Sequence, residues 1–161
     1  DAGRLNDAIA LYEQTLEDRT RILGPHHPDT LISRNNLASA YQDAGRLNDA
    51  IALYEQTLED CTRILGSDHP HALATRNNLA GAYQDASRLH EAIALYEQNL
   101  DDCTRILGPQ HPHTITTRHH LAEAYRSAGR FEDAEKFFET SSDSEDDQAG
   151  TEEDPDQETG D

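Results

Sequence analysis

Apolar residues recur along this chain three and four positions apart, a spacing that places them on one face of an α-helix. Residues 28–43 show this spacing around Leu31 and Leu37. Residues 48–65 show it again, with Leu58 within the apolar stripe. Neither stretch is apolar all round, and neither helix would be stable alone in water. The pattern therefore predicts helices that pair antiparallel and bury their apolar faces against other helices.

Residues that start and stop helices bound each predicted pair. Pro28 suits the first turn of a helix, and Gly45 suits the left-handed turn that ends one. Asn48 is a good N-cap for the second helix, which Gly66 then ends. The turn glycine is missing at Ser87, where a left-handed conformation costs roughly 1 kcal/mol. We expect that turn to be the least stable of the inner turns.

The whole pattern returns every 42 residues. Residues 2–43 and 44–85 are identical at 34 of 42 positions. The phrase at 2–18 returns unchanged at 44–60, edited at 86–102 and shortened at 128–140. A repeat of this length indicates a stacked array in which each unit buries its apolar face only against its neighbours. The predicted fold class is therefore an all-α solenoid of antiparallel helical hairpins.

The array is predicted to occupy residues 1–140. Its parts are the second helix of unit one at 5–23 and three further units at 28–65, 70–107 and 112–140. The first unit has no first helix, so part of the apolar face of 5–23 lacks a neighbour. Residues 141–161 hold ten acidic residues, no basic residue and no periodicity. We interpret them as a disordered acidic tail.

Side-chain size and charge add detail to the predicted packing. Ala38 and Ala50, with their repeats, would let helices approach closely, while Tyr54 and the other repeated aromatic residues fill wider gaps. Arg34 and Arg76 are expected to lean toward a helix interface.

Charge and cysteine content limit the classes of partner. The net charge is −19; without the ten tail acids, 22 acidic and 13 basic residues remain, a net charge of −9. Nucleic-acid backbones and anionic membranes would be repelled, and no apolar run approaches the length of a membrane span. Neither partner is expected. Cys61 and Cys103 occupy matching apolar positions, so we expect buried free thiols and a cytoplasmic location.

One motif connects the copies to a known family. LA-x-x-Y-x-x-x-G-R-x-x-x-A-x-x-x-Y is present at 37–54, at 79–96 with Ser87 for glycine, and at 121–138 with Phe138 for the last tyrosine. These residues resemble the tetratricopeptide repeat. The 42-residue period and an LGxxHP loop resemble the repeats of kinesin light chain and of large bacterial signalling proteins. The resemblance implies a right-handed superhelix whose concave face receives an extended peptide or a partner helix.

The resemblance also implies which residues face that concave groove, one set on each first helix. They are Asn35, Asn36, Ser39 and Gln42; then Asn77, Asn78, Gly81 and Gln84; then His119, His120, Glu123 and Arg126. Asn and Gln carry both a donor and an acceptor, so they can pair with a peptide backbone whatever its side chains. We predict a protein-interaction scaffold that binds a peptide or partner helix there. The alternative is a solvated polar face, or an Asn of each pair that bonds a neighbouring helix.

Other chemistry has less support in the sequence. No catalytic motif is present, and neither enzyme activity nor a cofactor is expected. The histidines that flank Pro70 and Pro112 invite a metal interpretation, but zinc needs three or four converging ligands, so we assign them to a structural loop. Some arrays of this family bind a C-terminal carboxylate with lysine and arginine on the groove. Lys136 is the only lysine here, so we do not expect such a carboxylate clamp. Ser142 and Ser144 precede acidic residues by three positions, as the targets of acid-directed kinases do. We interpret them instead as part of a solvated tail.

Three hypotheses stay open beside the scaffold. The chain has no Met and begins inside a repeat, so it would be the C-terminal part of a longer protein. It would then be the sensor or assembly arm of a signalling ATPase whose nucleotide-binding domain lies upstream. Alternatively it is a spacer, or it self-associates through the open edge at 5–23. Finally, His119 and His120 predict a partner affinity that changes between about pH 6 and 7.

Overall fold

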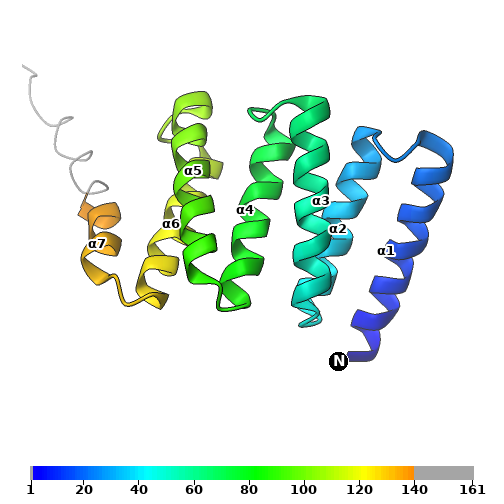
Figure 1. Cartoon of the computed structure of the whole chain (residues 1–161), viewed down its shortest axis with the longest axis horizontal. Helices are drawn as coiled ribbons and strands as arrows, with labels where there is room; N and C mark the ends of the chain where they lie inside the picture. Colours follow the sequence, from blue (N-terminus) through cyan, green and yellow to red (C-terminus); the bar gives the residue numbers. More distant parts are fainter. Residues whose placement is uncertain (1, 140–161) are drawn as a thin grey trace, which may run out of the picture.

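The computed structural model describes residues 2–139; the tail predicted at 141–161 lies outside them. The described residues form seven α-helices joined by short loops. They are α1 (Ala2–Leu23), α2 (Pro28–Asp43), α3 (Leu47–Leu65), α4 (Pro70–Asp85), α5 (Leu89–Leu107), α6 (Pro112–Ser127) and α7 (Phe131–Glu139). The helices follow one another in a row from α1 to α7 (Figure 1).

Packing in this row is between neighbours, as a solenoid requires. Each helix contacts the next one in sequence, and the only other contacts among the described helices join α2 to α4 and α4 to α6. The backbones of α1, α3, α5 and α7 do not approach one another in this way. Because the first helices of successive pairs lie closer together than the second helices do, the row is concave on the side of α2, α4 and α6. The prediction of an all-α repeat solenoid is confirmed.

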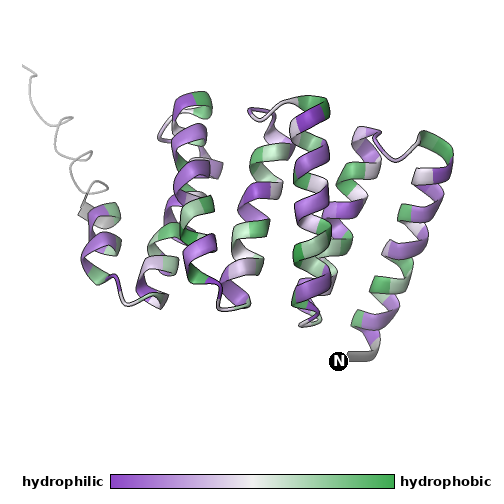
Figure 2. Cartoon of the chain, viewed as in Figure 1, coloured by the Kyte–Doolittle hydropathy of each residue, from purple (hydrophilic) through white to green (hydrophobic). Residues whose placement is uncertain are grey.

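Small residues line the seams between helices. Ala38 and Ala50 are fully buried and pack with Tyr54 and Leu79 in one cluster that joins α2, α3 and α4. The repeats of these alanines are buried in the same way: Ala80, Ala92, Ala122 and Ala134. Each helix carries separate hydrophobic and hydrophilic bands (Figure 2). The predicted role of the alanines and of Tyr54 is confirmed, because the small residues bring the helices together and the tyrosine fills the space beside them.

The inner turns have the left-handed residue that the sequence predicts. Gly45 has φ 72° and Gly129 has φ 73°, and Ser87 takes the matching conformation with φ 59°. The predicted N-cap at Asn48 is wrong, because α3 already begins at Leu47 and residue 46 precedes it. The first helix also begins earlier than predicted, at Ala2, because its Ala-Gly-Arg segment continues the helix where later units use it as a turn.

An arginine immediately precedes α3 and α5 and stacks on a tyrosine of the helix before. The guanidinium of Arg46 lies 4.1 Å from the centre of the Tyr41 ring, and its Nε donates to Asp49 Oδ2 at 2.8 Å. Arg88 stacks on Tyr83 in the same way at 4.3 Å. A cation over an aromatic face is an attractive contact. This contact holds the turn although no side chain caps the helix.

The outer loops are closed by histidine. In each loop the residue before proline accepts a hydrogen bond at Nδ1 from the backbone two residues ahead, at 3.1–3.2 Å; these residues are His27, His69 and His111. A side-chain acceptor at this position satisfies a backbone N–H group that the first turn leaves unpaired. The loop histidines therefore act as N-caps for α2, α4 and α6.

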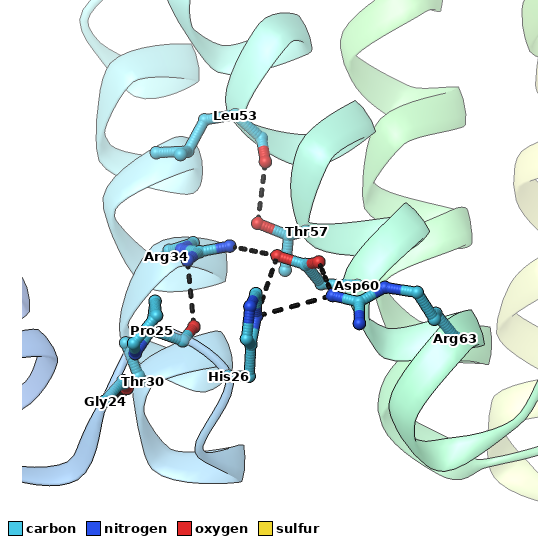
Figure 3. A network of polar contacts seen from close by, with 9 residues as sticks. All are labelled: Gly24, Pro25, His26, Thr30, Arg34, Leu53, Thr57, Asp60 and Arg63. Atoms are coloured by element: carbon cyan, nitrogen blue, oxygen red, sulfur yellow. Dashed lines mark hydrogen bonds and ion pairs between the residues drawn. The ribbon is translucent and has the colours of Figure 1, made fainter.

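Buried ion pairs join the two helices of a hairpin at the end opposite the inner turn. Arg34 Nη1 on α2 donates to Asp60 Oδ2 on α3 at 2.6 Å, and Arg63 Nη2 donates to Asp60 Oδ1 at 2.7 Å (Figure 3). Arg76 on α4 makes the same 2.6 Å contact with Asp102 on α5. The expectation that these arginines lean toward a helix interface is confirmed.

Candidate functional site

A hollow of ≈ 340 Å³ lies on the concave side of the array. Most of its lining comes from α2, α4 and α6, the three first helices, and two tyrosines reach it from α3 and α5. The lining residues are Ser39, Gln42, Asp43, Tyr54, Asn77, Asn78, Gly81, Gln84, Asp85, Tyr96, His120 and Glu123. The surface is mainly polar and open to solvent, unlike a closed small-molecule cavity.

The structure brings six of the ten residues predicted to bind a partner into this hollow. They are Ser39, Gln42, Asn77, Asn78, Gln84 and His120. The other four lie outside its lining. Asn35 sits beside it, since Asn78 Nδ2 donates to Asn35 Oδ1 at 3.5 Å. Asn36, His119 and Arg126 are exposed on the same helices but do not line the hollow.

Several of these polar groups already bond a neighbouring helix. Asn77 is buried between α4 and α6, where Thr117 Oγ1 donates to its Oδ1 at 3.3 Å and its Nδ2 lies 3.3 Å from His120 Nδ1. Gln42 Nε2 donates to Asp85 Oδ2 at 2.6 Å. The alternative interpretation, a bond between neighbouring helices, thus describes Asn77 and Gln42, and the longer 3.5 Å contact of Asn78 with Asn35 is of the same kind. The remaining amides of the hollow, on Asn78 and Gln84, are half-buried at its surface.

Two tyrosines at matched positions form the floor of the hollow with different partners. The hydroxyl of Tyr54 bonds Ser39, whereas the residue that matches Ser39 beneath Tyr96 is Gly81. Burial raises the pKa of Tyr54 to about 12 despite that bond, and the charge of Asp43 adds to the effect. Burial also raises the pKa of Tyr96, so both hydroxyls keep their protons at neutral pH.

Sequence reasoning missed the tyrosines and two acids of this site. Tyr54 and Tyr96 had been assigned to packing alone, and Asp43 and Asp85 had not been considered. The aspartates do carry a signal in the sequence, since each directly follows a glutamine of the groove set and repeats with it. The tyrosines carry no such signal, because they belong to the second helices and reach the concave side only through the gaps left by small residues.

Other kinds of site are not formed within residues 2–139. No group of three or more His, Cys, Asp or Glu side chains there is arranged to hold a metal ion. Cys61 and Cys103 are free thiols buried against neighbouring helices. No helix in that range is both long and apolar enough to cross a membrane.

Comparison with known proteins identifies the class to which this array belongs. A sequence model of the tetratricopeptide repeat family matches residues 1–63, 35–98 and 71–144. The chain therefore belongs to the tetratricopeptide repeat family, whose repeats generally mediate protein–protein interactions and are not catalytic.

Solved structures with kinesin-light-chain-like repeats are similar to the chain. Two crystal structures of a candidate kinesin light chain from Podosopora anserina, with nearly identical TPR-like repeats, are similar to it. One is 33% identical over 86% of this chain, with a TM-score of 0.74, and the other is 34% identical over 85%, with a TM-score of 0.72. BtubC (BKLC) from P. vanneervenii has a TM-score of 0.79 over 98% of this chain at 21% identity, which shows a shared fold.

The matched structures are longer than this chain. This chain spans 65% of the length of each Podosopora structure and 63% of BtubC. No curated protein matches the chain.

Proposed function

We propose that this chain is a scaffold that binds a peptide or partner helix in the concave hollow between α2, α4 and α6. The observation that carries the proposal is the convergence of amide and hydroxyl side chains from three successive repeats on one open surface. Such groups pair with the N–H and C=O groups of an extended chain, and the hollow is too open to enclose a small substrate. The chain then acts by binding rather than by catalysis, without a cofactor. Two buried free thiols suit a cytoplasmic setting.

The test removes three polar side chains from the surface of the hollow. The triple variant Asn78→Ala, Gln84→Ala and His120→Ala changes residues that line the hollow and are only half-buried. Affinity capture from a lysate of the source cells, followed by titration of the purified partner, should show binding to the unaltered chain and loss of binding to this variant. Helicity measured by circular dichroism should be unchanged.

The repeat supplies a matched control on the opposite side. Gln14, Gln56 and Gln98 occupy one position on α1, α3 and α5, and all three are exposed. Changing these three to alanine removes an equal number of polar groups from the second helices and should leave partner binding intact. Equal binding by the hollow variant and the unaltered chain would refute the proposal.

Self-association through α1 is the second candidate function, since one observation favours it. Leu11 and Ile22 are 66% and 69% exposed, and Tyr12 is 40% exposed although the matching Tyr54 is 1% exposed. Leu11 and Tyr12 are thus more exposed than the matching Leu53 and Tyr54 of the next repeat. Sedimentation of the chain at high concentration tests this directly, since a monomer would exclude it. The role as an arm of a signalling ATPase stays a prediction. A nucleotide-binding motif in the sequence upstream of residue 1 would support it.

A further inference from the structure

The charged residues of the hollow are all acidic. Asp43, Asp85 and Glu123 are exposed at its edge, and none of its lining residues is a lysine or an arginine. Asp85 also accepts the 2.6 Å hydrogen bond from Gln42, which holds one of its oxygens in place and leaves the other open. A groove of one sign attracts groups of the opposite sign.

A second observation concerns a buried hydroxyl within the same surface. Tyr96 is only 2% exposed, and its hydroxyl faces the hollow, 3.4 Å from the position that a Cβ would take on Gly81. No residue of the described chain makes a hydrogen bond to that hydroxyl, whereas the matching hydroxyl of Tyr54 bonds Ser39. The Tyr96 hydroxyl is therefore a donor and acceptor at the surface of the hollow that no side chain of the described residues occupies, and it is available to a partner from outside.

The charges nearest this hydroxyl come from two different helices. Asp85 on α4 and Glu123 on α6 both act on Tyr96 electrostatically, and the ring of His120 lies 5.8 Å from the tyrosine ring. A phenol oxygen with two carboxylates beside it offers only acceptors and one neutral donor. This arrangement suits a group with several N–H donors and a positive charge.

We infer that the hollow binds the side chain of a lysine or arginine in a partner segment, held by Asp85, Glu123 and the Tyr96 hydroxyl. This inference rests on the proposed function, because the cationic side chain belongs to the bound peptide. The amides of Asn78 and Gln84 then contact the backbone of that peptide, and the three acceptors select its charge. The inference excludes acidic peptides from the same position, since the carboxylates would repel them.

The experiment uses the full chain and a displayed library of random dodecapeptides as the probe. Peptides that still bind the triple variant of Asn78, Gln84 and His120 are set aside, which removes those that bind the acidic residues 141–161. The remaining peptides should share one basic residue. Synthetic versions with citrulline in place of arginine, or norleucine in place of lysine, should bind about tenfold more weakly.

Two pairs of charge changes locate the effect on the protein. Asp85→Asn with Glu123→Gln removes two carboxylates from the hollow and should weaken binding about tenfold or more. Glu59→Gln with Asp101→Asn changes the net charge by the same amount on exposed second-helix positions, and it should leave affinity unchanged. The change Gly81→Ser gives the Tyr96 hydroxyl the partner that Ser39 gives Tyr54. It should lower peptide affinity and raise the melting temperature.

The possible outcomes distinguish a failure of this inference from a failure of the proposed function. Hollow-dependent peptides without a shared basic residue, or with equal affinity for the Asp85/Glu123 variant, overturn the inference and leave the scaffold proposal standing. If no peptide depends on the hollow at all, the proposed function fails, and the inference fails with it. A Gly81→Ser variant that is more stable but binds unchanged would remove Tyr96 from the contact.

Discussion

Arg34 on α2 donates to Asp60 on α3 through a 2.6 Å contact, with side chains that are 10% and 12% exposed. A second arginine, Arg63, donates to the other carboxylate oxygen of Asp60, so the acid neutralises a buried cation and an exposed one. The matching acid on α1 is Asp18, which is exposed and pairs only with Arg21 three residues on. The same residue type thus occurs in a buried and an exposed setting at one repeat position.

This difference predicts unequal effects of the same substitution. Asp60→Asn should lower the free energy of unfolding by roughly 3 kcal/mol, because it leaves the buried charge of Arg34 with only neutral oxygens as partners, the new amide oxygen and the Pro25 carbonyl. Asp18→Asn should change it by less than about 0.5 kcal/mol, since an exposed pair contributes little. Urea unfolding of both variants measures the two values. Similar losses would contradict the assignment of a buried pair.

The same carboxylate predicts how acid affects stability. Burial alone would raise the pKa of Asp60, but hydrogen bonds from Arg63 and Arg34 outweigh burial and lower the pKa below its ordinary value of 3.8. The unfolded chain therefore takes up this proton at a higher pH than the folded chain does. The stabilisation is fully present above pH 3.8 and is lost as the pH falls through the folded pKa.

A pair of titrations tests this sign. The difference in free energy of unfolding between the unaltered chain and Asp60→Asn should stay constant from about pH 6 to 5 and shrink toward about pH 2.5. The Asp18→Asn variant serves as the control and should run parallel to the unaltered chain. A difference that grows in acid would contradict the lowered pKa.

Sequence reasoning predicted the parts of this fold that depend on neighbouring residues. Pro28 and Gly45 mark helix ends because their backbone preferences act locally, and the alanine seams follow from periodicity. The start of α3 was missed because no side chain caps it, so the N-cap signal at Asn48 misled; Arg46 precedes the helix and stacks on the Tyr41 ring instead.

The site depended on contacts that periodicity does not encode. Gln42 and Asp85 lie 43 residues apart and meet only because α2 packs on α4. The approach of Tyr96 to the concave side depends on the absence of a side chain at Gly81. Resemblance to the family pointed to the face of the first helices, where the hollow lies. The structure was needed to show that, of two asparagines that both line the hollow, Asn77 is buried between helices and Asn78 is half-buried.

Asn99 is a residue whose replacement should stabilise the protein. It is fully buried in α5, and neither its Nδ2 nor its Oδ1 has a hydrogen-bond partner. The matching residue in α3 is Thr57, also fully buried, whose Oγ1 donates to the Leu53 carbonyl at 2.6 Å. Asn99→Thr should therefore raise the free energy of unfolding by about 1–3 kcal/mol.

The repeat again supplies the control for this change. Thr57→Asn introduces the unpaired amide into α3 and should destabilise the chain by a similar amount. Thermal unfolding of both variants should show melting temperatures shifted in opposite directions. If Asn99→Thr melts at or below the temperature of the unaltered chain, the amide has a partner that the structure does not show.

The two cysteines should react slowly in the folded protein. Cys61 is 1% exposed and Cys103 is fully buried, and burial raises the pKa of both thiols. Since the thiolate is the reactive form, a buried thiol with a raised pKa is unreactive. Labelling with a disulfide reagent at neutral pH should proceed at the rate of unfolding and become fast in denaturant. Rapid labelling without denaturant would show that the helix seams open readily.

Ser87 offers the most direct test of the inner turns. It is the only non-glycine residue with a positive φ among the described residues, at 59°, where Gly45 and Gly129 hold 72° and 73°. A Cβ in this region costs about 1 kcal/mol, so Ser87→Gly should stabilise the chain by about that amount. The reverse change, Gly45→Ser, meets no atom within 4 Å and should cost the same from backbone strain alone. Hydrogen exchange should also slow at the Ala86–Arg88 turn in the glycine variant. If the two changes shift stability in opposite directions but by different amounts, contacts of the serine side chain account for the difference. A loss of stability in Ser87→Gly would refute the backbone strain at Ser87.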